Sequence, residues 1–463
     1  MVSLFKESIV YAAYFLGLLA PFFLLPIGIA VYFGERLAAV GFFLVFLILV
    51  GFWYFLRKSV SVKDFSKRTY LLVLFLVFPI GAMVCSIPFL FEGFGFFASI
   101  FDAMSGWTTT GVTLHSGEIS QSLLFFRSFL EWVGGMGFIF FAFLILKSPF
   151  QQDEHKVYID KIKNIRGISI KSFTQKIFGV YVILTGACFL LLLMSGMTWF
   201  DAINLAMVTL STGGFFWYSS FSDIQKIILI IFMLLGASCF VLFLIRKNFI
   251  KSLLNNIEFK VMVVVIFVGG CIFAIDSDII SSVFLATSAL SGTGIITNNI
   301  DLTQISPFAI LLLFGFMITG GSYSSTTGGL KIWRIIILFK TIYAEIKKYL
   351  LPENAVIPVI FEHNVIDKKE IHNVFVYISI FFMVLFGSAV IFLVFGGLNF
   401  FDSLFTAAAF LSNAGIMIID ITSLSFVSQL LCFFLMWMGR IEILGFLVFV
   451  SSVLYVIKER ANY

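Results

Sequence analysis

Long apolar runs, separated by short polar segments, make up most of this chain. A helix needs about 20 apolar residues to cross the hydrocarbon core of a bilayer. Only 12% of the residues are charged, too few to cover the surface of a soluble protein of this size. The sequence therefore predicts an all-α polytopic membrane protein. We expect ten crossings, at about 9–33, 37–56, 70–91, 121–146, 174–194, 224–245, 261–275, 306–340, 374–397 and 427–457.

The Lys and Arg residues collect in alternate loops between these runs. The positive-inside rule places such loops in the cytoplasm. With an even number of crossings, both termini are then expected on the cytoplasmic side of the cytoplasmic (inner) membrane. The basic loops are 57–69, 147–176, 246–260 and 331–373, and the loops without Lys or Arg are 92–120, 196–223, 276–305 and 397–426.

Several kinds of site are not expected in this chain. The five cysteines lie singly in apolar runs without a CxxC pair, and the four histidines lack HExxH spacing, which argues against disulfides and zinc. The GxSxG motif is absent, because Ala289 stands two residues before Ser291, at the first required glycine. The basic loops explain the net charge of +5, so this charge is not evidence for nucleic-acid binding. We expect no enzyme activity and no cofactor bound by the chain itself.

Each loop without Lys or Arg contains an apolar stretch that is too short to span a bilayer. A run of small or hydroxyl-bearing residues and a glycine ends every stretch. Four such stretches in equivalent positions indicate an internal repeat of helix, re-entrant half-helix, extended turn and helix. The stretches are Ala98–Thr113, Asp201–Phe216, Ser281–Thr297 and Asp402–Ile418, with aligned glycines Gly111, Gly214, Gly294 and Gly415.

These repeats divide the chain into five parts. An N-terminal transmembrane hairpin is expected before the first repeat, and the second and third repeats each include a cytoplasmic loop. The third repeat also includes an interrupted helix. The parts are 1–69 for the hairpin and 70–147, 148–246, 247–373 and 374–463 for the repeats.

Re-entrant half-helices of this kind favour a cation. Non-helical backbone at membrane depth is tolerated only inside protein or beside a wet cavity. A half-helix entering from outside directs its partly negative C-terminal end at the membrane centre, and carbonyl oxygens in the following turn can replace the hydration shell of an ion. Glycine allows the backbone conformations and close approach that such a turn needs. We interpret Asp201, Asp402 and Asp102 as helix N-caps rather than as ion ligands.

The motifs together resemble the Trk/Ktr/HKT superfamily of potassium transporters, over residues from about 70 to 460. The hairpin at 9–56 is similar to the additional N-terminal helix pair of the TrkH-like branch. One departure is Ala98, which stands where the family often has Asp at the start of the first pore helix. The matching strings are Asp102–Gly111, Glu131–Gly137, Ser211–Phe215, Thr319–Lys331, Ser412–Gly415 and Met438–Glu442.

The resemblance implies a pseudo-fourfold, K+-channel-like pore formed by one chain. Glycine at all four aligned positions points to potassium, since a serine in the first repeat accompanies sodium permeation in one plant branch. A symporter that couples K+ to Na+ or H+ would use the same filter and remains the alternative. The implied K+-binding filter residues are Thr109, Thr110, Gly111, Val112, Thr212, Gly213, Gly214, Phe215, Gly292, Thr293, Gly294, Ile295, Asn413, Ala414, Gly415 and Ile416.

Members of this superfamily are usually homodimers that are gated by a cytosolic, TrkA-like nucleotide-binding ring. A nucleotide is therefore expected only on the partner subunit. Segments 341–373 and 147–172 are the largest cytoplasmic surfaces and are candidate docking sites for such a ring. Each of these segments can equally be a solvated linker.

The apolar run 306–340 is interrupted by a segment rich in glycine and hydroxyl groups, 319–329, which cannot form a good helix. It resembles the intramembrane gating loop of the family. A phosphate-binding loop is not expected, because Lys331 is followed by Ile332 and the GxxxxGK[ST] spacing fails. The implied gate residues are Gly320, Gly321, Ser322, Ser324, Ser325, Thr326, Thr327, Gly328, Gly329, Lys331 and Arg440.

Charged residues inside apolar runs are costly and usually face a cavity or a partner. The family resemblance places Arg440 in the pore below the filter as an electrostatic barrier. The alternative is an ion pair with Glu131 or Glu442, although Glu442 is two residues away and points to another helix face. Lys331 either acts similarly or begins the cytoplasmic basic belt. Glu131 is expected to orient local backbone rather than to bind ions.

Overall fold

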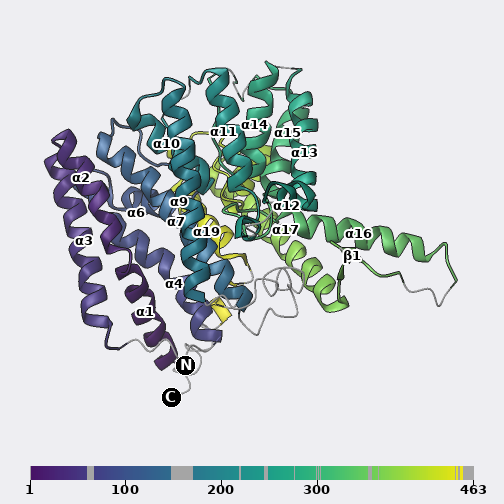
Figure 1. Cartoon of the computed structure of the whole chain (residues 1–463), viewed down its shortest axis with the longest axis horizontal. Coiled ribbons are helices and arrows are strands. Elements are labelled where there is room, and N and C mark those ends of the chain that lie inside the picture. The colour runs from purple at the N-terminus through teal and green to yellow at the C-terminus, as the bar shows by residue number, and fades with distance from the viewer. Residues whose placement is uncertain are drawn as a thin grey trace.

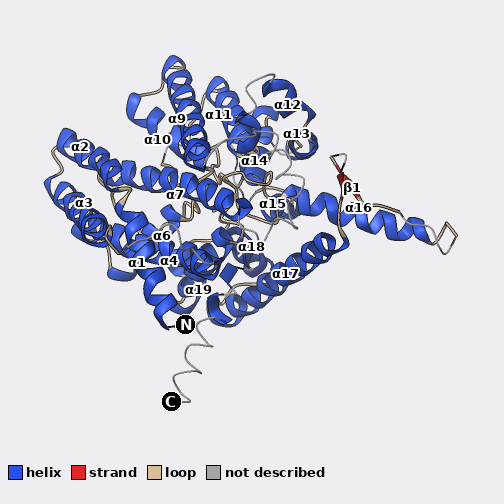
Figure 2. Cartoon of the chain, turned by 60° about the horizontal axis from the view of Figure 1, so that its bottom comes forward, coloured by secondary structure: helices blue, strands red, loops and turns tan. Residues whose placement is uncertain are grey.

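The computed structural model is almost entirely helical, as Figures 1 and 2 show. Helix α16 and the hairpin beside it extend away from the rest of the molecule in both views. The structure describes residues 2–59, 67–147, 170–217, 220–244, 249–275, 277–298, 300, 302, 304–352, 357–362, 364–443, 445–446 and 449–451.

The N-terminal hairpin contains four helical segments. Its first two long segments bend by 46° at a break between Gly17 and Ala20. Gly17 allows close packing inside the hairpin, because a Cβ there would lie 2.6 Å from the backbone N of Trp53. The segments are α1 (Val2–Gly17), η1 (Ala20–Phe23), α2 (Leu24–Phe33) and α3 (Arg36–Leu56).

The first two repeats follow the hairpin. Each contains a long helix, a short helix, an extended turn and a second helix. The first is built from α4 (Lys67–Cys85), α5 (Ile87–Phe91), α6 (Phe96–Trp107) and α7 (Gln121–Lys147), and the second from α9 (Ile170–Met194), α10 (Trp199–Ser211), α11 (Asp223–Gly236) and η3 (Phe240–Leu244).

The last two repeats follow the same order. Between them an antiparallel hairpin pairs Ile360 with Val365 and Phe361 with Asn364. The third repeat contains α12 (Phe249–Asn255), α13 (Ile257–Phe273), α14 (Ile279–Ser291), α15 (Pro307–Thr319) and α16 (Ile332–Lys348), then β1 (Ile360–Phe361) and β2 (Asn364–Val365); the fourth contains α17 (Lys368–Gly396), α18 (Phe400–Leu411), η4 (Ile421–Ser423) and α19 (Phe426–Ile441).

The short helices of the four repeats are packed in a cyclic order. Each packs on its own first helix and on the second helix of the preceding repeat. The pairs with the preceding repeat are α10 with α7, α14 with α11, and α18 with α15, and α6 packs on α19 to join the last repeat to the first. This order brings the C-terminal ends of four sequence-distant helices together.

Four helices are long and apolar enough to cross a membrane within the residues that the structure describes, and two bent pairs raise that number to six. They correspond to six of the ten predicted runs, and α7 corresponds to a seventh. The four helices are Arg36–Leu56, Leu72–Phe91, Gln175–Met194 and Lys368–Gly396, and the bent pairs are Phe5–Gly17 with Ala20–Phe33 and Phe249–Asn255 with Ile257–Phe273.

The other three runs are not continuous helices. The break in 306–340 was predicted, but runs 224–245 and 427–457 were expected to be unbroken and that expectation was wrong. Helix α11 ends at Gly236, and the next carbonyl, that of Ala237, accepts a hydrogen bond of 2.9 Å from the Ser322 amide. Helix α19 ends at Ile441, and the next residue, Glu442, has a positive φ of 66°. The carbonyl that follows α11 thus has a tertiary partner, and hydropathy does not record such partners.

The N-terminal hairpin packs on α4 and α5 of the first repeat, and two further kinds of contact attach it to α7. The ring of Phe23 packs edge-on against Phe129 with centroids 5.5 Å apart, and Phe42 lies 4.8 Å from Phe126. The Glu35 carboxylate, between α2 and α3, accepts hydrogen bonds from the first two backbone amides of α7, at 2.9 and 2.8 Å. The Glu35 carboxylate therefore caps α7 from another part of the chain, since the first amides of a helix lack intrahelical partners.

Candidate functional site

The four short helices end with the same backbone hydrogen bond. The amide of Thr110 donates to the carbonyl of Ser105, five residues earlier, at 2.9 Å. Its counterparts in the other repeats run from Gly213, Thr293 and Ala414 at 2.9, 2.9 and 3.0 Å. This bond, from the amide of C″ to a carbonyl of the last helical turn, is the mark of a Schellman ending. The sequence repeat is therefore a repeat of backbone geometry.

A residue in the left-handed region precedes each aligned glycine by two positions. The φ angles are 56° at Thr109, 54° at Thr212, 68° at Gly292 and 53° at Asn413. A β-branched residue with positive φ is a genuine outlier, and such strain concentrates at functional sites. Two threonines held in this conformation, at the same place in two repeats, single out these turns.

The four turns meet in the order of the repeats. A Cβ at Gly111 would lie 2.1 Å from the Cα of Gly214, and one at Gly214 would lie 3.3 Å from the Thr293 carbonyl oxygen. A Cβ at Gly294 would lie 2.3 Å from the carbonyl oxygen of Ala414. A Cβ at Gly415 would lie 1.9 Å from the Thr110 carbonyl oxygen and so closes the ring. The structure thus brings together the residues that were predicted as a filter.

The aligned glycines differ from their neighbours in solvent exposure. Gly111, Gly214, Gly294 and Gly415 are partly exposed, whereas every other residue of the predicted filter is buried. The side chains of the turns are held by their own repeats or by adjacent ones: Asn413 Nδ2, for example, donates to Thr110 Oγ1 at 2.9 Å and to the Met436 carbonyl at 2.9 Å. Backbone at the glycines is therefore what the turns present to a small solute.

The aspartates predicted as N-caps occupy other positions. Thr198 and Asn399 are the N-caps of α10 and α18, and Asp201 and Asp402 lie three residues later, where each carboxylate accepts a bond from the cap side chain at 2.7 Å. This reciprocal arrangement resembles a capping box, so the prediction found the right helix start and the wrong residue.

Asp102 is not a cap in any sense, because it lies in the second half of α6 and is fully buried. Its carboxylate accepts bonds from Thr113 Oγ1 at 2.8 Å and from the Leu114 amide at 3.1 Å, and it forms an ion pair with Arg127 of α7. The Arg127 guanidinium also lies 5.0 Å from the ring centre of Phe215 in the second repeat. The carboxylate fixes the chain that leaves the first turn.

The glycine- and hydroxyl-rich segment lies against the C-terminal ends of two short helices. Thr326 Oγ1 contacts the carbonyls of Leu210 and Gly236 at 3.3 and 3.0 Å and accepts a bond from Thr212 Oγ1 at 3.1 Å. A Cβ at Gly328 would lie 2.0 Å from the Ser412 carbonyl oxygen. All residues from Gly320 to Lys331 are buried. The predicted gate segment therefore packs directly beneath the turns of the second and fourth repeats.

Arg440 holds this segment to the first repeat. Its side chain is 1% exposed, and its Nη1 donates to the Thr326 carbonyl at 2.6 Å. Its Nη2 donates to the Gly134 carbonyl of α7 at 3.2 Å. Glu442 forms an ion pair of 2.8 Å with Arg334 instead, as its position on another helix face predicted. The guanidinium thus joins three repeats at one point.

Lys331 is buried, with 3% of its surface exposed. Its Nζ donates to the Thr327 carbonyl and, at 2.9 Å, to Thr327 Oγ1. Its ammonium group therefore folds back on the predicted gate segment rather than into solvent.

Other buried charges were missing from the sequence interpretation. Arg127 lies in the run 121–146, and Lys226, in the run 224–245, donates to Ser281 Oγ at 2.8 Å at the start of α14. Glu258 Oε2 accepts a bond of 2.8 Å from the Tyr323 amide of the gate segment. The signal that identified Arg440, a charge within an apolar run, also marks Arg127 and Lys226.

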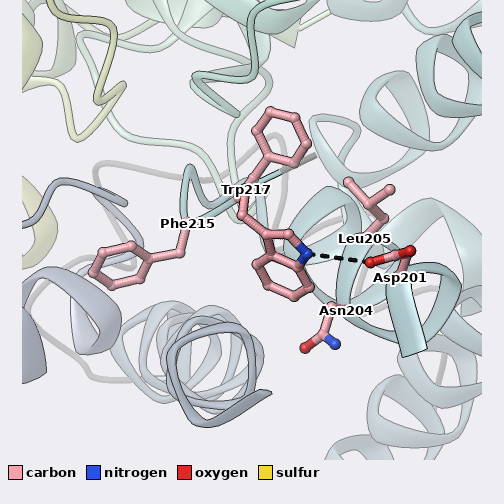
Figure 3. Close-up of a pocket in the computed structure, with 6 residues that line it drawn as sticks. Asp201, Asn204, Leu205, Phe215 and Trp217 are labelled. Atoms are coloured by element: carbon pink, nitrogen blue, oxygen red, sulfur yellow. Dashed lines mark hydrogen bonds between the residues drawn. The ribbon is translucent and has the colours of Figure 1, made fainter. Parts of the chain in front are cut away.

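A small pocket lies beside the second turn (Figure 3). It is lined on one side by Asp201 and Asn204 of α10 and on the other by Phe215 and Trp217. The Trp217 indole donates to the Asp201 carboxylate at 3.2 Å. The ring of Phe215 points away from this hydrogen bond in Figure 3. This arrangement braces the outer end of α10 against the chain that follows its turn.

Of the predicted docking segments, 148–169 lies outside the described residues and 341–373 is described in part. Helix α16 exposes apolar side chains together with basic ones in its last turn. The hairpin next to it is attached to the body through Glu362, which accepts a bond of 2.9 Å from Asn256 Nδ2.

Fold and site together define a class, that of multi-pass helical membrane proteins in which strained turns from four repeats converge inside the molecule. The sequence profile of the TrkH family, described as "Cation transport protein", matches residues 38–259 and 249–455. The chain belongs to the TrkH family, and the resemblance noted in its motifs is confirmed.

Individual relatives agree with this assignment. An uncharacterized cation transporter of Methanocaldococcus jannaschii is 30% identical over 447 residues, 94% of this chain and 93% of the relative. The Trk system potassium uptake protein TrkH of Escherichia coli is 27% identical over 431 residues, 86% of this chain and 87% of its own. The crystal structure of the potassium transporter TrkH from Vibrio parahaemolyticus superposes with a TM-score of 0.83 at 23% identity, covering 96% and 98% of the two chains. That superposition establishes the fold.

Proposed function

We propose that this protein translocates K+ across the cytoplasmic membrane through a selectivity filter formed by the four converging turns. The observation that carries the proposal is the equivalence of those turns: each follows a Schellman ending, contains a left-handed residue and presents a partly exposed glycine. The partly negative helix ends favour a cation, and backbone carbonyls can replace its hydration shell. The naming of relatives as potassium uptake proteins supports K+ as that cation.

The segment 319–331, which is buried from Gly320 onward, is the gate in this proposal. Its position against the ends of α10 and α18, and its bond to the Arg440 guanidinium, support an obstruction that is both steric and electrostatic. K+ is the cargo rather than a resident cofactor, and its ligands are the backbone carbonyls of the filter.

The proposed assembly follows the charge pattern and the family. Both termini lie in the cytoplasm, since the basic loops alternate along the chain. The chain forms a homodimer, and a cytosolic TrkA-like ring docks on the cytoplasmic segments and carries the regulatory nucleotide. Relatives named as members of a "Trk system" support a partner of this kind.

A flux assay in proteoliposomes tests the function. We expect uptake of Rb+ and K+ down their gradients, with Na+ strongly disfavoured, and greater flux when a ring subunit is added. Uptake that requires an imposed Na+ or H+ gradient would assign the protein to symport instead. Equal flux of K+ and Na+ by the folded protein would contradict the potassium filter.

A further inference from the structure

The second repeat lacks a hydroxyl that the first repeat uses to hold its filter. In the first repeat, Ser105 Oγ accepts a hydrogen bond of 2.8 Å from the amide of Val112, the residue after the aligned glycine. The corresponding position of the second repeat, six residues before Gly214, is Val208, which has no polar atom in its side chain. The amide of Phe215 needs an acceptor from elsewhere, because a buried amide without one is costly.

The Glu131 carboxylate provides this acceptor from the neighbouring repeat. Glu131 lies on α7, and its side chain is fully buried. Its Oε1 accepts hydrogen bonds from the amides of Gly214 and Phe215, at 2.8 and 2.9 Å. One carboxyl oxygen therefore holds two successive peptide groups in place.

These two hydrogen bonds fix the direction of the filter carbonyls. The described peptide bonds are trans, and in a trans peptide the C=O points opposite to the N–H of the next residue. With the amides of Gly214 and Phe215 directed at Glu131, the carbonyls of Gly213 and Gly214 are directed away from it. Gly214 also lies against the turns of the first and third repeats, since a Cβ there would lie 3.1 Å from the Thr110 carbonyl oxygen and 3.3 Å from that of Thr293.

Gly213 shows that the sequence is adapted to this carboxylate. The second repeat reads Thr-Gly-Gly, whereas the others place Thr, Thr and Ala directly before the aligned glycine. Gly213 is not among the described glycines with positive φ, so its backbone conformation does not require glycine. A Cβ at this position would lie 2.3 Å from the Glu131 Cδ and 2.4 Å from Oε2. The carboxylate therefore accounts for the second glycine.

We infer that Glu131 is a positioning residue for ion selection: its carboxylate replaces, from the adjacent repeat, the serine hydroxyl that orients the filter backbone in the first repeat. This inference rests on the proposed potassium filter and adds to it an acceptor that sets the geometry of one quarter of the ring. Glu131 acts through the peptide groups of Gly214 and Phe215.

The test compares Rb+ uptake with its inhibition by Na+ for purified variants in proteoliposomes. Glu131→Ala is expected to lower discrimination between Rb+ and Na+ by about tenfold or more, equivalent to about 1.4 kcal/mol. Glu131→Gln keeps an acceptor oxygen at the same distance and is expected to stay within about threefold of the wild type, a difference of about 0.7 kcal/mol. Glu118→Ala, at an exposed position, is the control and should change nothing.

Two further variants separate positioning from folding. Val208→Ser in the Glu131→Ala background places a hydroxyl where Ser105 has one, and it is expected to restore most of the lost discrimination. Gly213→Ala should impair the wild type but have little further effect after Glu131→Ala, because the truncation makes room for the new Cβ.

Three results would overturn the inference: unchanged discrimination in Glu131→Ala, a loss in Glu131→Gln as large as that in Glu131→Ala, or failure of Val208→Ser to restore discrimination in well-folded protein. The wild type is measured first. If the wild type itself does not distinguish Rb+ from Na+, the proposed filter is wrong; if it does and Glu131→Ala does too, only this inference fails.

Discussion

A few residues with left-handed backbone conformation shape the four converging turns. Thr109 and Thr212 adopt left-handed φ values of 56° and 54°, which cost about 1–3 kcal/mol each for a residue of this type. The hydrogen bonds of the Schellman endings and the packing of neighbouring turns maintain that strain. The result is a set of peptide groups whose directions are fixed by the packing of the turns.

Gly111 is the residue at which an added side chain should affect ion selection most directly. Its φ is 72°, and a Cβ would lie 2.1 Å from the Cα of Gly214. Gly111→Ser must therefore displace the second turn, and we expect discrimination against Na+ to fall by about tenfold or more. Competition of Na+ with Rb+ uptake measures the change. Gly179→Ser is the control, since a Cβ there meets nothing within 4 Å; equal selectivity in the two variants would contradict the filter assignment.

Arg440 combines a fixed charge with a contact that holds the gate. A guanidinium about 5 Å from a passing cation, in an effective dielectric near 20, raises its energy by about 3 kcal/mol. Arg440→Ala also removes the bond to the Thr326 carbonyl, and we expect Rb+ flux to rise by about 10- to 100-fold without a change in selectivity. Arg440→Lys should fall between, because it keeps the charge without the planar fork.

Purified yield and monodispersity must accompany these Arg440 measurements. Loss of a buried partner can simply impair folding, and that outcome would appear as low yield. The exposed Arg36→Ala variant serves as the control. Normal yield with unchanged or reduced flux in Arg440→Ala would rule out the barrier role.

At the scale of elements, the discontinuous helices are as important as the continuous ones. Helices α11, α15 and α19 all end near the gate segment, and the carbonyls that α11 leaves free accept bonds from Ser322 and Thr326. Broken helices are tolerated at membrane depth only where protein or water satisfies the freed backbone groups. Residues of the gate segment therefore donate to backbone carbonyls that would accept helical hydrogen bonds if α11 continued.

Thr326 offers an isosteric test of that attachment. Thr326→Val keeps the shape of the side chain and removes the hydrogen bonds of its hydroxyl with Thr212, Leu210 and Gly236. Each buried hydrogen bond contributes about 0.5–1.5 kcal/mol, so basal Rb+ flux should rise severalfold as the segment loosens. Thr422→Val, at an exposed position, should leave flux unchanged. A variant with a shortened 319–329 segment should show a still higher Rb+ flux. If such variants fold well and keep wild-type flux, the segment is not the barrier.

The whole molecule is a closed cycle of repeats with a separate hairpin attached to one of them. Packing of α6 on α19 closes the cycle, so each short helix is held by two repeats. The hairpin contacts the cycle at α7 through aromatic rings and the Glu35 carboxylate. Since α7 also carries Glu131 and the Gly134 carbonyl, the hairpin supports the helix that holds both the second turn and Arg440.

Glu35 should therefore matter for stability rather than for conduction. Glu35→Ala removes the carboxylate that caps the amides of Gln121 and Ser122, and loss of a helix cap costs about 0.5–2 kcal/mol. We expect Tm in detergent to fall by several degrees and Rb+/Na+ discrimination to remain. Glu35→Gln retains one acceptor oxygen and should lose about half as much. The exposed Glu118→Ala is the matched control, and an equal Tm for both alanine variants would contradict the capping role.

Repetition made the site predictable from the sequence. The four stretches ending in glycine carried enough information to name the turns that meet, because a repeated local pattern reports a repeated local conformation. The partners of individual side chains could not be predicted as well. The sequence predicted Asp201 as a cap three residues from the true cap, and Asp102 forms an ion pair with Arg127. Such pairings depend on which neighbouring helix is adjacent, and that adjacency is not encoded in the spacing along one helix.

The sequence by itself determined the membrane character, the order of the repeats and the identity of the converging glycines, because hydropathy and local backbone preference depend on nearby residues. Only the tertiary structure decided where α11 and α19 break, which carbonyls hold Arg440, and that Lys331 is buried in the gate segment. It also decided that Glu131 replaces a missing hydroxyl in the next repeat. The physical reason is that a freed backbone group or a buried charge is stabilised by whatever partner lies across the interface, and that partner can be hundreds of residues away in the chain.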